Sequence, residues 1–271
     1  MNLEKTMELE LDERQRAMLQ EMGVHVWLPL PISEPVLQTP VAPVRHAPAQ
    51  RPAAPRAPAV APPIAVAAPP VEAVVLPSTG WPALQQAAAT CQACSLCAGR
   101  KHSTLHPPLV AQADWLVVGD PPDEDEDRLA QPFVEQAGLL LDNMLKAVGA
   151  SRTGAGRQGA YLTNVVKCRP PQGQLPQAAD LAQCAAYLHR EVALVQPKVI
   201  LAMGRFATQV LLSEHPEQAA LPLGKQRGMV YRYRGIPVVV TYHPKVLLRA
   251  SADKAKAWAD LCLAFEAMAA A

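Results

Sequence analysis

Proline is distributed very unevenly along this chain, and that distribution limits where a compact domain can form. Of the 28 prolines, 15 lie between Pro29 and Pro82, among many alanines and valines. The stretch has neither helical nor strand periodicity, and it cannot bury enough apolar surface to fold. We therefore predict a semi-stiff, partly polyproline II linker at residues 29–84 and a folded domain at residues 85–271.

The segment before this linker carries separate signals. Residues 12–22 fit one short helix, with Asp12 as the N-cap and Gly23 as the stop. The residues that follow, through Trp27, are expected to be extended. We interpret residues 1–28 as a short helix with a docking peptide.

Charge and cysteine content narrow the class of protein. The net charge is +1, so any contact with nucleic acid must come from a local basic patch rather than from a global field. The N-terminus has no apolar signal region and no apolar run reaches transmembrane length, so we expect a cytoplasmic protein. In that compartment six cysteines favour a metal or cluster site over disulfides.

Predicted strands and helices alternate through the second part of the chain. Strands are expected at 114–119, 160–166 and 198–203, helices at 136–149, 178–195 and 205–212, a hairpin at 229–234 and 236–241, and closing helices to about 268. In helix 136–149 the expected buried stripe is Leu140, Met144 and Val148. This pattern predicts an α/β fold, a doubly wound and mainly parallel sheet whose site lies at the carboxyl ends of the strands.

The cysteines fall into a close pair and two distant members. Cys91 and Cys94 are separated by two residues just before the first strand, while Cys168 and Cys184 are 16 apart. Four such thiolates can hold a 4Fe-4S cluster or an all-cysteine zinc ion, and spacing alone leaves both open. Cys184 also lies on an apolar helix stripe, so a buried free thiol is the alternative interpretation.

Two further cysteines are not needed for a four-ligand site. Cys97 extends the first group by one thiol, and its role is not determined by the spacing. Cys262 lies in the last predicted helix, where we expect it in the core.

Several motifs occur in a consistent order along residues 88–265. They are Cys91-Gln-Ala-Cys94-Ser-Leu96, Pro132-Phe133-Val134, Thr163-Asn164-Val165-Val166-Lys167-Cys168-Arg169-Pro170-Pro171, Pro197-Lys198-Val199-Ile200, Gly204-Arg205 and Thr241-Tyr242-His243-Pro244. In these motifs the chain resembles the iron–sulfur (family 4) uracil-DNA glycosylases. The resemblance implies a three-layer glycosylase fold, base-excision repair of uracil in DNA, and a structural 4Fe-4S cluster on Cys91, Cys94, Cys168 and Cys184.

The chemistry of uracil excision can be set beside these residues. A flipped base needs an aromatic face, for which Phe133 is the candidate. The resemblance also implies that Gly119 is a substrate-binding residue. Asn164 can donate to uracil O4 and accept from N3–H, a pattern that cytosine reverses. His243 can stabilise negative charge on O2 in the transition state. Asp120 and Glu126 stand where the family places the carboxylates that support the sugar and orient water.

Cations near the motifs are candidates for phosphate contacts. They are Lys167, Arg169, Arg227, Lys245 and Arg249. We expect the partner to be uracil-containing DNA, single- or double-stranded, and the protein to be a monomer.

The first motif departs from the family pattern, which usually reads Gly-Glu-Ala-Pro-Gly. Here it is Gly119-Asp120-Pro121-Pro122-Asp123. Asp120 is one methylene shorter than glutamate, so we expect slow catalysis. Asp123 is expected to crowd the flipped nucleotide and repel phosphate. The acidic run 123–127 is expected to be a solvated loop.

A different function class therefore remains open. The same fold can serve as a non-catalytic replication or repair adaptor. Residues 18–27 resemble the N-terminal peptide of the psi subunit of the bacterial clamp loader, which would make the clamp loader a partner through residues 12–28.

Overall fold

The computed structural model describes residues 76, 80–109, 112–171 and 174–270. The chain divides into two units, Met1–Ile64 and Ala65–Ala271, and the described residues belong to the second. The predictions for residues 12–28 and for nearly all of the linker at 29–84 lie outside the described residues.

A five-stranded sheet forms the centre of the described part. Its strands are β1 (Ala113–Gly119), β2 (Gly156–Asn164), β3 (Val199–Met203), β4 (Val230–Tyr233) and β5 (Ile236–Thr241). They lie in the order β2-β1-β3-β5-β4, and all neighbours are parallel except the β4–β5 hairpin. The predicted α/β fold with a doubly wound, mainly parallel sheet is confirmed.

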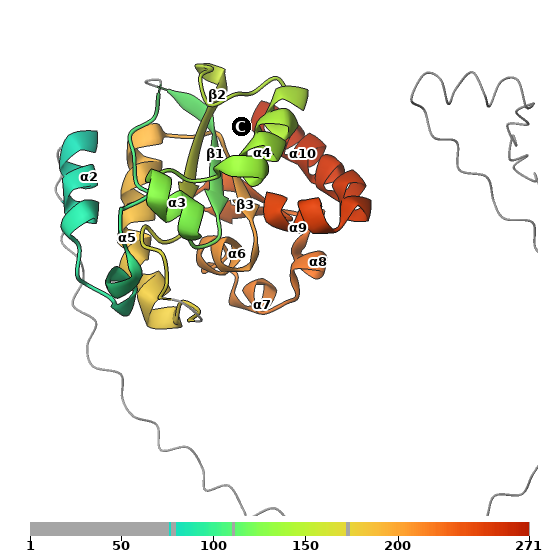
Figure 1. The fold of residues 1–271 in the computed structure, drawn as a ribbon. Coiled ribbons are helices and arrows are strands. Elements are labelled where there is room, and N and C mark those ends of the chain that lie inside the picture. The colour runs from blue at the N-terminus through green and yellow to red at the C-terminus, as the bar shows by residue number, and fades with distance from the viewer. Residues whose placement is uncertain (1–75, 77–79, 110–111, 172–173, 271) are drawn as a thin grey trace, which may run out of the picture. The chain divides into compact units, whose positions relative to one another are not determined.

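Helices cover both faces of this sheet (Figure 1). They are α2 (Trp81–Thr90), α3 (Glu124–Leu129), α4 (Glu135–Ala147), α5 (Ala178–Val195), α6 (Arg205–Leu211), α7 (Pro216–Ala219), α8 (Leu223–Gln226), α9 (Pro244–Arg249) and α10 (Lys254–Ala269), with 3-10 turns at Ser95–Gly99 and Ser251–Asp253. Apolar residues of α2, α5 and α6 pack on one face, and those of α4 and α10 on the other. Among the described residues, no helix has the length and apolar character that a membrane span requires.

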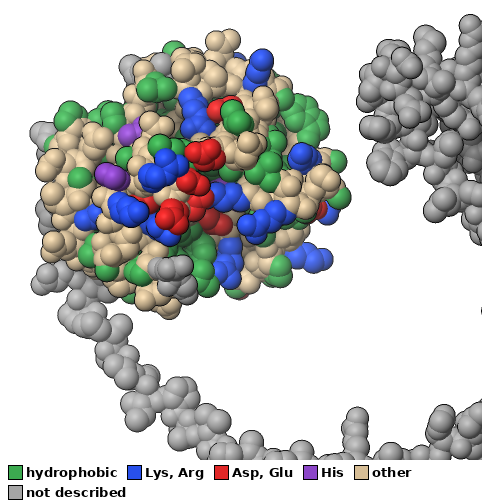
Figure 2. Space-filling model, viewed as in Figure 1, with side chains coloured by type: hydrophobic (Ala, Val, Ile, Leu, Met, Phe, Trp, Pro, Cys, Tyr) green, Lys and Arg blue, Asp and Glu red, His purple; other side chains and the backbone are tan. Residues whose placement is uncertain are grey.

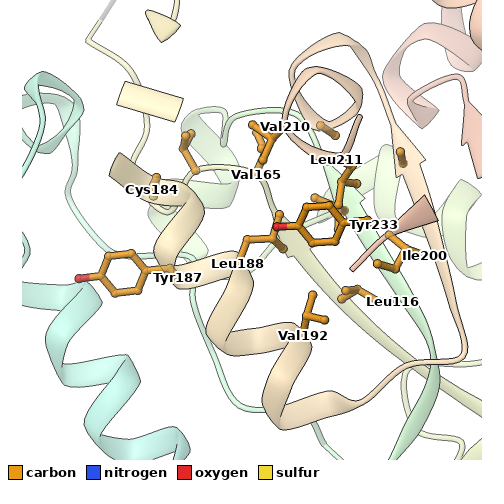
Figure 3. Packing of buried hydrophobic residues seen from close by; sticks show 14 of the residues in the cluster. Leu116, Val165, Cys184, Tyr187, Leu188, Val192, Ile200, Val210, Leu211 and Tyr233 are labelled. Atoms are coloured by element: carbon orange, nitrogen blue, oxygen red, sulfur yellow. The ribbon is translucent and has the colours of Figure 1, made fainter. Parts of the chain in front are cut away.

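The core on the α5 face illustrates why these segments fold as they do. Strand residues Leu116 and Ile200 meet Leu188 and Val192 of α5, and Tyr187 lies on the same helix (Figure 3). Strands buried on both faces read as continuous apolar runs, while α5 presents one apolar stripe at helical spacing. Both patterns are visible in the sequence, which explains the agreement for these elements.

Two predictions about the helices need correction. In α4 the buried stripe is Leu141 and Leu145 together with Ala137 and Gly138, whereas Leu140, Met144 and Val148 are only partly buried. Three consecutive leucines at 139–141 allow more than one apolar stripe at helical spacing, so the spacing alone does not decide which stripe is buried. Cys262, expected in the core, is also only partly buried.

The domain begins earlier than the predicted residue 85. Helix α2 starts at Trp81, and Leu84 and Ala88 are buried in the core. Pro82 stands in the first turn of this helix, where its missing N–H removes no helical hydrogen bond. A proline in that place resembles the linker in sequence, so the boundary was set too late.

The register of the sheet brings distant segments together. Across the sheet, Asn164 pairs with Gly119, Gly119 with Met203, and Met203 with Thr241. The carboxyl ends of four parallel strands therefore lie side by side. Strand order reverses beside β1, which is the position where open α/β sheets bind ligands.

Candidate active site

The residues that follow these aligned strand ends converge on one site. Asp120 follows β1, Asn164 ends β2, Gly204 follows β3, and His243 lies two residues beyond β5. All four were singled out in the sequence, and the sheet register places them at one edge.

Phe133 is held in this site in a strained conformation. Its φ is 51°, in the left-handed region that a bulky side chain rarely adopts. Its backbone N–H donates to Glu126 Oε1 at 2.7 Å, and Arg152 Nη2 donates to its carbonyl at 2.7 Å. A Cβ on Gly119 would lie 2.5 Å from Phe133 Cζ, so glycine there makes room for the ring. Such strain is maintained by the surrounding contacts and is typical of functional sites.

His243 stacks on this ring and is a neutral donor. The Phe133 and His243 rings are 5.2 Å apart and nearly parallel, at 14°. The Lys245 backbone N–H donates to His243 Nδ1 at 3.2 Å. Burial, and then the charge of Lys245, lowers the pKa of His243 to about 3. The neutral ring therefore carries its proton on Nε2, which is free to donate to a developing anion.

Asn164 is fully buried, and its two ends have different environments. Its Nδ2 donates to the Asp120 carbonyl at 3.0 Å and to Glu126 Oε1 at 3.3 Å. Its Oδ1 is buried and has no hydrogen-bond partner among the described residues. Both amide protons have acceptors among the described residues, and the expected donation from Asn164 to uracil O4 stays a prediction. The free atom is an acceptor, as required for uracil N3–H.

Glu126 connects the parts of the site. Its Oε1 accepts from Phe133 N and Asn164 Nδ2, and its Oε2 accepts from Asp123 N at 3.0 Å and Lys245 Nζ at 2.7 Å. With a side chain 1% exposed and four donors bound, this carboxylate has little capacity to orient water. The geometry favours a positioning role over the catalytic role expected from the sequence.

Asp120 is partly buried and faces the start of α6. Its Oδ1 accepts from Phe206 N at 2.8 Å and Ala207 N at 3.2 Å. Burial raises the pKa of this carboxyl, while the backbone donors of α6 oppose the rise. Gly204, with φ 101°, is in contact with the carboxylate, and a Cβ there would collide with it.

Asp123 was expected to obstruct the site, and the structure gives it a different role. Residues 124–129 are helix α3, not a loop, and Asp123 caps it by accepting from Glu126 N at 2.9 Å. Acidic residues at a helix N-terminus are favourable. Asp123 Oδ2 also pairs with Lys245 Nζ at 2.7 Å, and Glu126 N together with Lys245 lowers the pKa of Asp123 despite the opposing effect of burial.

The predicted phosphate contacts separate into two groups. Lys167 is buried and cannot reach a phosphate, so that expectation is corrected. Arg227 pairs with Asp260 at 2.7 Å, and Lys245 with Asp123 and Glu126, so both are already engaged. Arg169 is partly exposed beside Glu124, and Arg249 is exposed on α9. Figure 2 shows acidic side chains gathered in the middle of this face with Lys and Arg on both sides.

The predicted metal ligands meet where the segment after α2, the loop after β2 and helix α5 come together. One cavity is lined by Cys91, Cys94, Cys97, Cys168 and Cys184, all of them free thiols. Arg100 Nη1 donates to Cys168 Sγ at 3.2 Å, and Lys167 N donates to Cys184 Sγ at 3.4 Å. Burial raises the pKa of Cys94 to about 11 and that of Cys184 to about 12, so without a metal these thiols stay protonated.

The arrangement of the thiols is compatible with both metal hypotheses. Among the described residues, no three His, Cys, Asp or Glu side chains gather closely enough to hold one metal ion. Zinc requires four sulfurs at about 2.3 Å from a single point. A 4Fe-4S cluster is likewise held by four cysteine thiolates.

Comparison with known proteins agrees with this geometry. The family model described as the uracil DNA glycosylase superfamily matches residues 107–262, from the segment before β1 into α10. The chain belongs to the uracil DNA glycosylase superfamily. It is 34% identical over 140 residues to the type-4 uracil-DNA glycosylase of Sulfurisphaera tokodaii, covering 51% of this chain and 62% of that protein.

Two further relatives are also type-4 uracil-DNA glycosylases. The type-4 enzyme of Archaeoglobus fulgidus is 33% identical over 165 residues, covering 59% of this chain and 78% of the relative. That of Thermotoga maritima is 36% identical over 135 residues, covering 49% and 66%. The matched segments cover 62% to 78% of the length of these three relatives, and less than two thirds of the first.

Two residues that support the candidate site are not predicted from the sequence. Arg152 braces the Phe133 loop and pairs with Asp142 at 2.6 Å. Glu191 is buried behind β2 and pairs with Lys167. Neither stands next to a motif that carries chemistry. Arg152 lies in a turn, where no pattern points to it. Glu191 interrupts the apolar stripe of α5, and this interruption is the one sequence signal that could have identified it as a buried charge.

Proposed function

We propose that this chain hydrolyses the N-glycosidic bond of uracil in DNA, as the first step of base-excision repair. The observation that carries the proposal is the buried Asn164 Oδ1, an acceptor without a partner beside the Phe133–His243 pair. An unpaired buried acceptor costs free energy unless a ligand satisfies it. Uracil presents N3–H there, whereas cytosine presents a lone pair that this oxygen would repel.

The remaining groups fit the reaction. As the glycosidic bond breaks, negative charge develops on uracil O2, and the Nε2–H of neutral His243 can donate to it without losing its own proton. Phe133 supplies the aromatic wall of the pocket. Asp120 is the carboxylate that we assign to the sugar, whose positive character increases in the transition state. Because Asp120 is short and faces α6, we expect turnover to be slow.

We also propose that the cysteine cavity holds a 4Fe-4S cluster on Cys91, Cys94, Cys168 and Cys184. When bound, it would supply no chemistry to excision and would tie the segment before β1 to the loop after β2 and to α5. The donor set of thiols and the N–H groups aimed at two sulfurs support this assignment.

Expected partners follow from this activity. We propose that the protein acts in the cytoplasm on single- or double-stranded DNA, as a monomer, with Arg169 and Arg249 near the backbone. The clamp loader remains a predicted partner through residues 12–28, which lie outside the described residues. No feature of the described residues favours the adaptor hypothesis.

Excision from a single-stranded oligonucleotide with one uracil tests the proposal. Wild type should release uracil, and His243→Ala and Asn164→Ala should each slow release by roughly one to three orders of magnitude. Lys198→Met, which removes an exposed lysine paired with Asp114 away from the site, is the matched control. An inert wild type with a full cluster content would refute the activity and restore the adaptor hypothesis.

A further inference from the structure

A buried ion pair lies between Asn164, the proposed uracil-binding residue, and the cysteine cavity. Lys167 Nζ and Glu191 Oε2 are 2.6 Å apart, with side chains 1% and 0% exposed. Removing two charges from water is expensive, and an apolar pair of similar size is often as stable. Stability alone is therefore a weak reason for this pair, and its contacts indicate a more specific role.

The ammonium group of Lys167 donates a hydrogen bond to the main chain of Asn164. Its three donors are all used, to Glu191 Oε2, to Thr163 Oγ1 at 2.7 Å and to the Asn164 carbonyl at 2.6 Å. Glu191 is fixed in turn, because its Oε1 accepts from Thr163 Oγ1 at 2.8 Å and Tyr161 Oη at 2.9 Å. These hydrogen bonds thus fix the carboxyl end of β2 at Asn164, the residue proposed to contact the base.

The backbone of the same lysine belongs to the wall of the cysteine cavity. Lys167 lines that cavity, its N–H donates to Cys184 Sγ, and the next residue is Cys168. Its carbonyl accepts from Thr104 N at 3.1 Å. One residue therefore contacts the thiol-bearing loop with its backbone and Asn164 with its side chain.

We infer that Lys167 is a positioning residue, which with Glu191 fixes Asn164 and transmits the order of the cysteine-lined loop to uracil recognition. The inference rests on the proposed uracil excision for its functional consequence. A displacement of about 1 Å in a residue that positions the substrate can lower the rate on the order of a hundredfold. The Asn164 carbonyl oxygen is two bonds from the Cα, so fixing it limits the displacement of the side chain.

The test uses Lys167→Met, which keeps length and apolar volume but removes the donors. The double variant Lys167→Met/Glu191→Gln removes both charges and leaves an acceptor for Tyr161 and Thr163, so it guards against misfolding from a lone buried carboxylate. Lys198→Met is the control for loss of a lysine paired with an acidic residue outside the site.

Single-turnover excision is measured against enzyme concentration on a uracil oligonucleotide and on the matching cytosine oligonucleotide. We expect both variants to lower the maximal excision rate about 10- to 100-fold. The enzyme concentration at half-maximal rate should change by less than about threefold. The ratio of the rate on uracil to the rate on cytosine should fall. Unchanged maximal rate and preference in the folded double variant would overturn the inference.

Hydrogen exchange gives a readout independent of catalysis. In the double variant, amides of residues 160–168 should exchange faster than in wild type, while those of α10 stay unchanged. If wild type excises no uracil, the proposed function fails and exchange alone decides the inference. Equal protection of residues 160–168 in both proteins would refute it.

Discussion

At the scale of single residues, the site depends on groups whose ordinary properties are changed by burial. His243 has the clearest change, since it is 4% exposed and its pKa is lowered to about 3 from 6.5. The residue that would be a pH-dependent cation on the surface is a permanent neutral donor here. This state suits an oxyanion donor better than a charged ring, which would give up its proton.

The pKa of His243 predicts a pH dependence of stability. Its folded pKa lies below the unfolded value of 6.5, so the unfolded chain binds an extra proton below that pH and stability falls from about pH 6.5 downward. At pH 5 the loss is about 2 kcal/mol relative to pH 8, from the 1.36 kcal/mol per unit relation. Urea unfolding of wild type and His243→Asn at several pH values measures it. Parallel pH curves for the two proteins would contradict the prediction.

At the scale of elements, α3 shows how an unusual sequence can be accommodated. The acidic residues 123–127 would repel DNA if they acted alone. Asp123, the first of them, caps the helix. Glu126 completes the capping box and also accepts hydrogen bonds from Phe133 N and Lys245 Nζ. The helix thereby joins the loop that carries Phe133 to helix α9, which carries Lys245. Its acidic residues are part of the framework of the site as well as of its surface.

The cap of α3 makes a prediction about Asp123. Asp123→Ala should lower the free energy of unfolding by about 1 kcal/mol, because it removes a cap acceptor, whereas Asp123→Asn should cost less, since asparagine is an equally good cap. The lost pairing with Lys245 adds little at a partly exposed position. Glu124→Ala, in the exposed first turn, is the control. Equal destabilisation by the alanine and asparagine variants would show that charge, not capping, is the role of Asp123.

At the scale of the whole molecule, two sites share the loop after β2. Asn164 at the strand end belongs to the candidate active site, while Cys168, four residues later, lines the cysteine cavity. The segment from Cys91 to Arg100 and helix α5 are brought to the same cavity by folding. A bound cluster would therefore connect parts of the domain that are far apart in sequence.

The proposed cluster predicts a colour and an iron content. Protein purified without oxygen should be brown and contain about four iron atoms per chain. Cys168→Ser and Cys184→Ser should lose most of the iron, and Cys262→Ser, outside the cavity, should keep it. A colourless protein with one zinc per chain, purified under the same conditions, would contradict the assignment.

The sequence by itself determined the alternation of strands and helices, the two close cysteines, and the motif residues at strand ends. Each of these depends on local periodicity or spacing, so apolar runs such as 114–119 and the stripe of α5 were readable without tertiary contacts. The resemblance in motifs was confirmed by the superfamily match.

Only the tertiary structure decided which charged residues are exposed and able to contact DNA, and which are buried in ion pairs within the domain. Lys167 and Arg169 are two positions apart on one motif, yet the first is buried against Glu191 and the second is partly exposed. The partner that decides this lies 24 residues away along the chain, on another element. The same holds for Glu126 and Lys245, because burial and pairing depend on which segments the sheet register brings together.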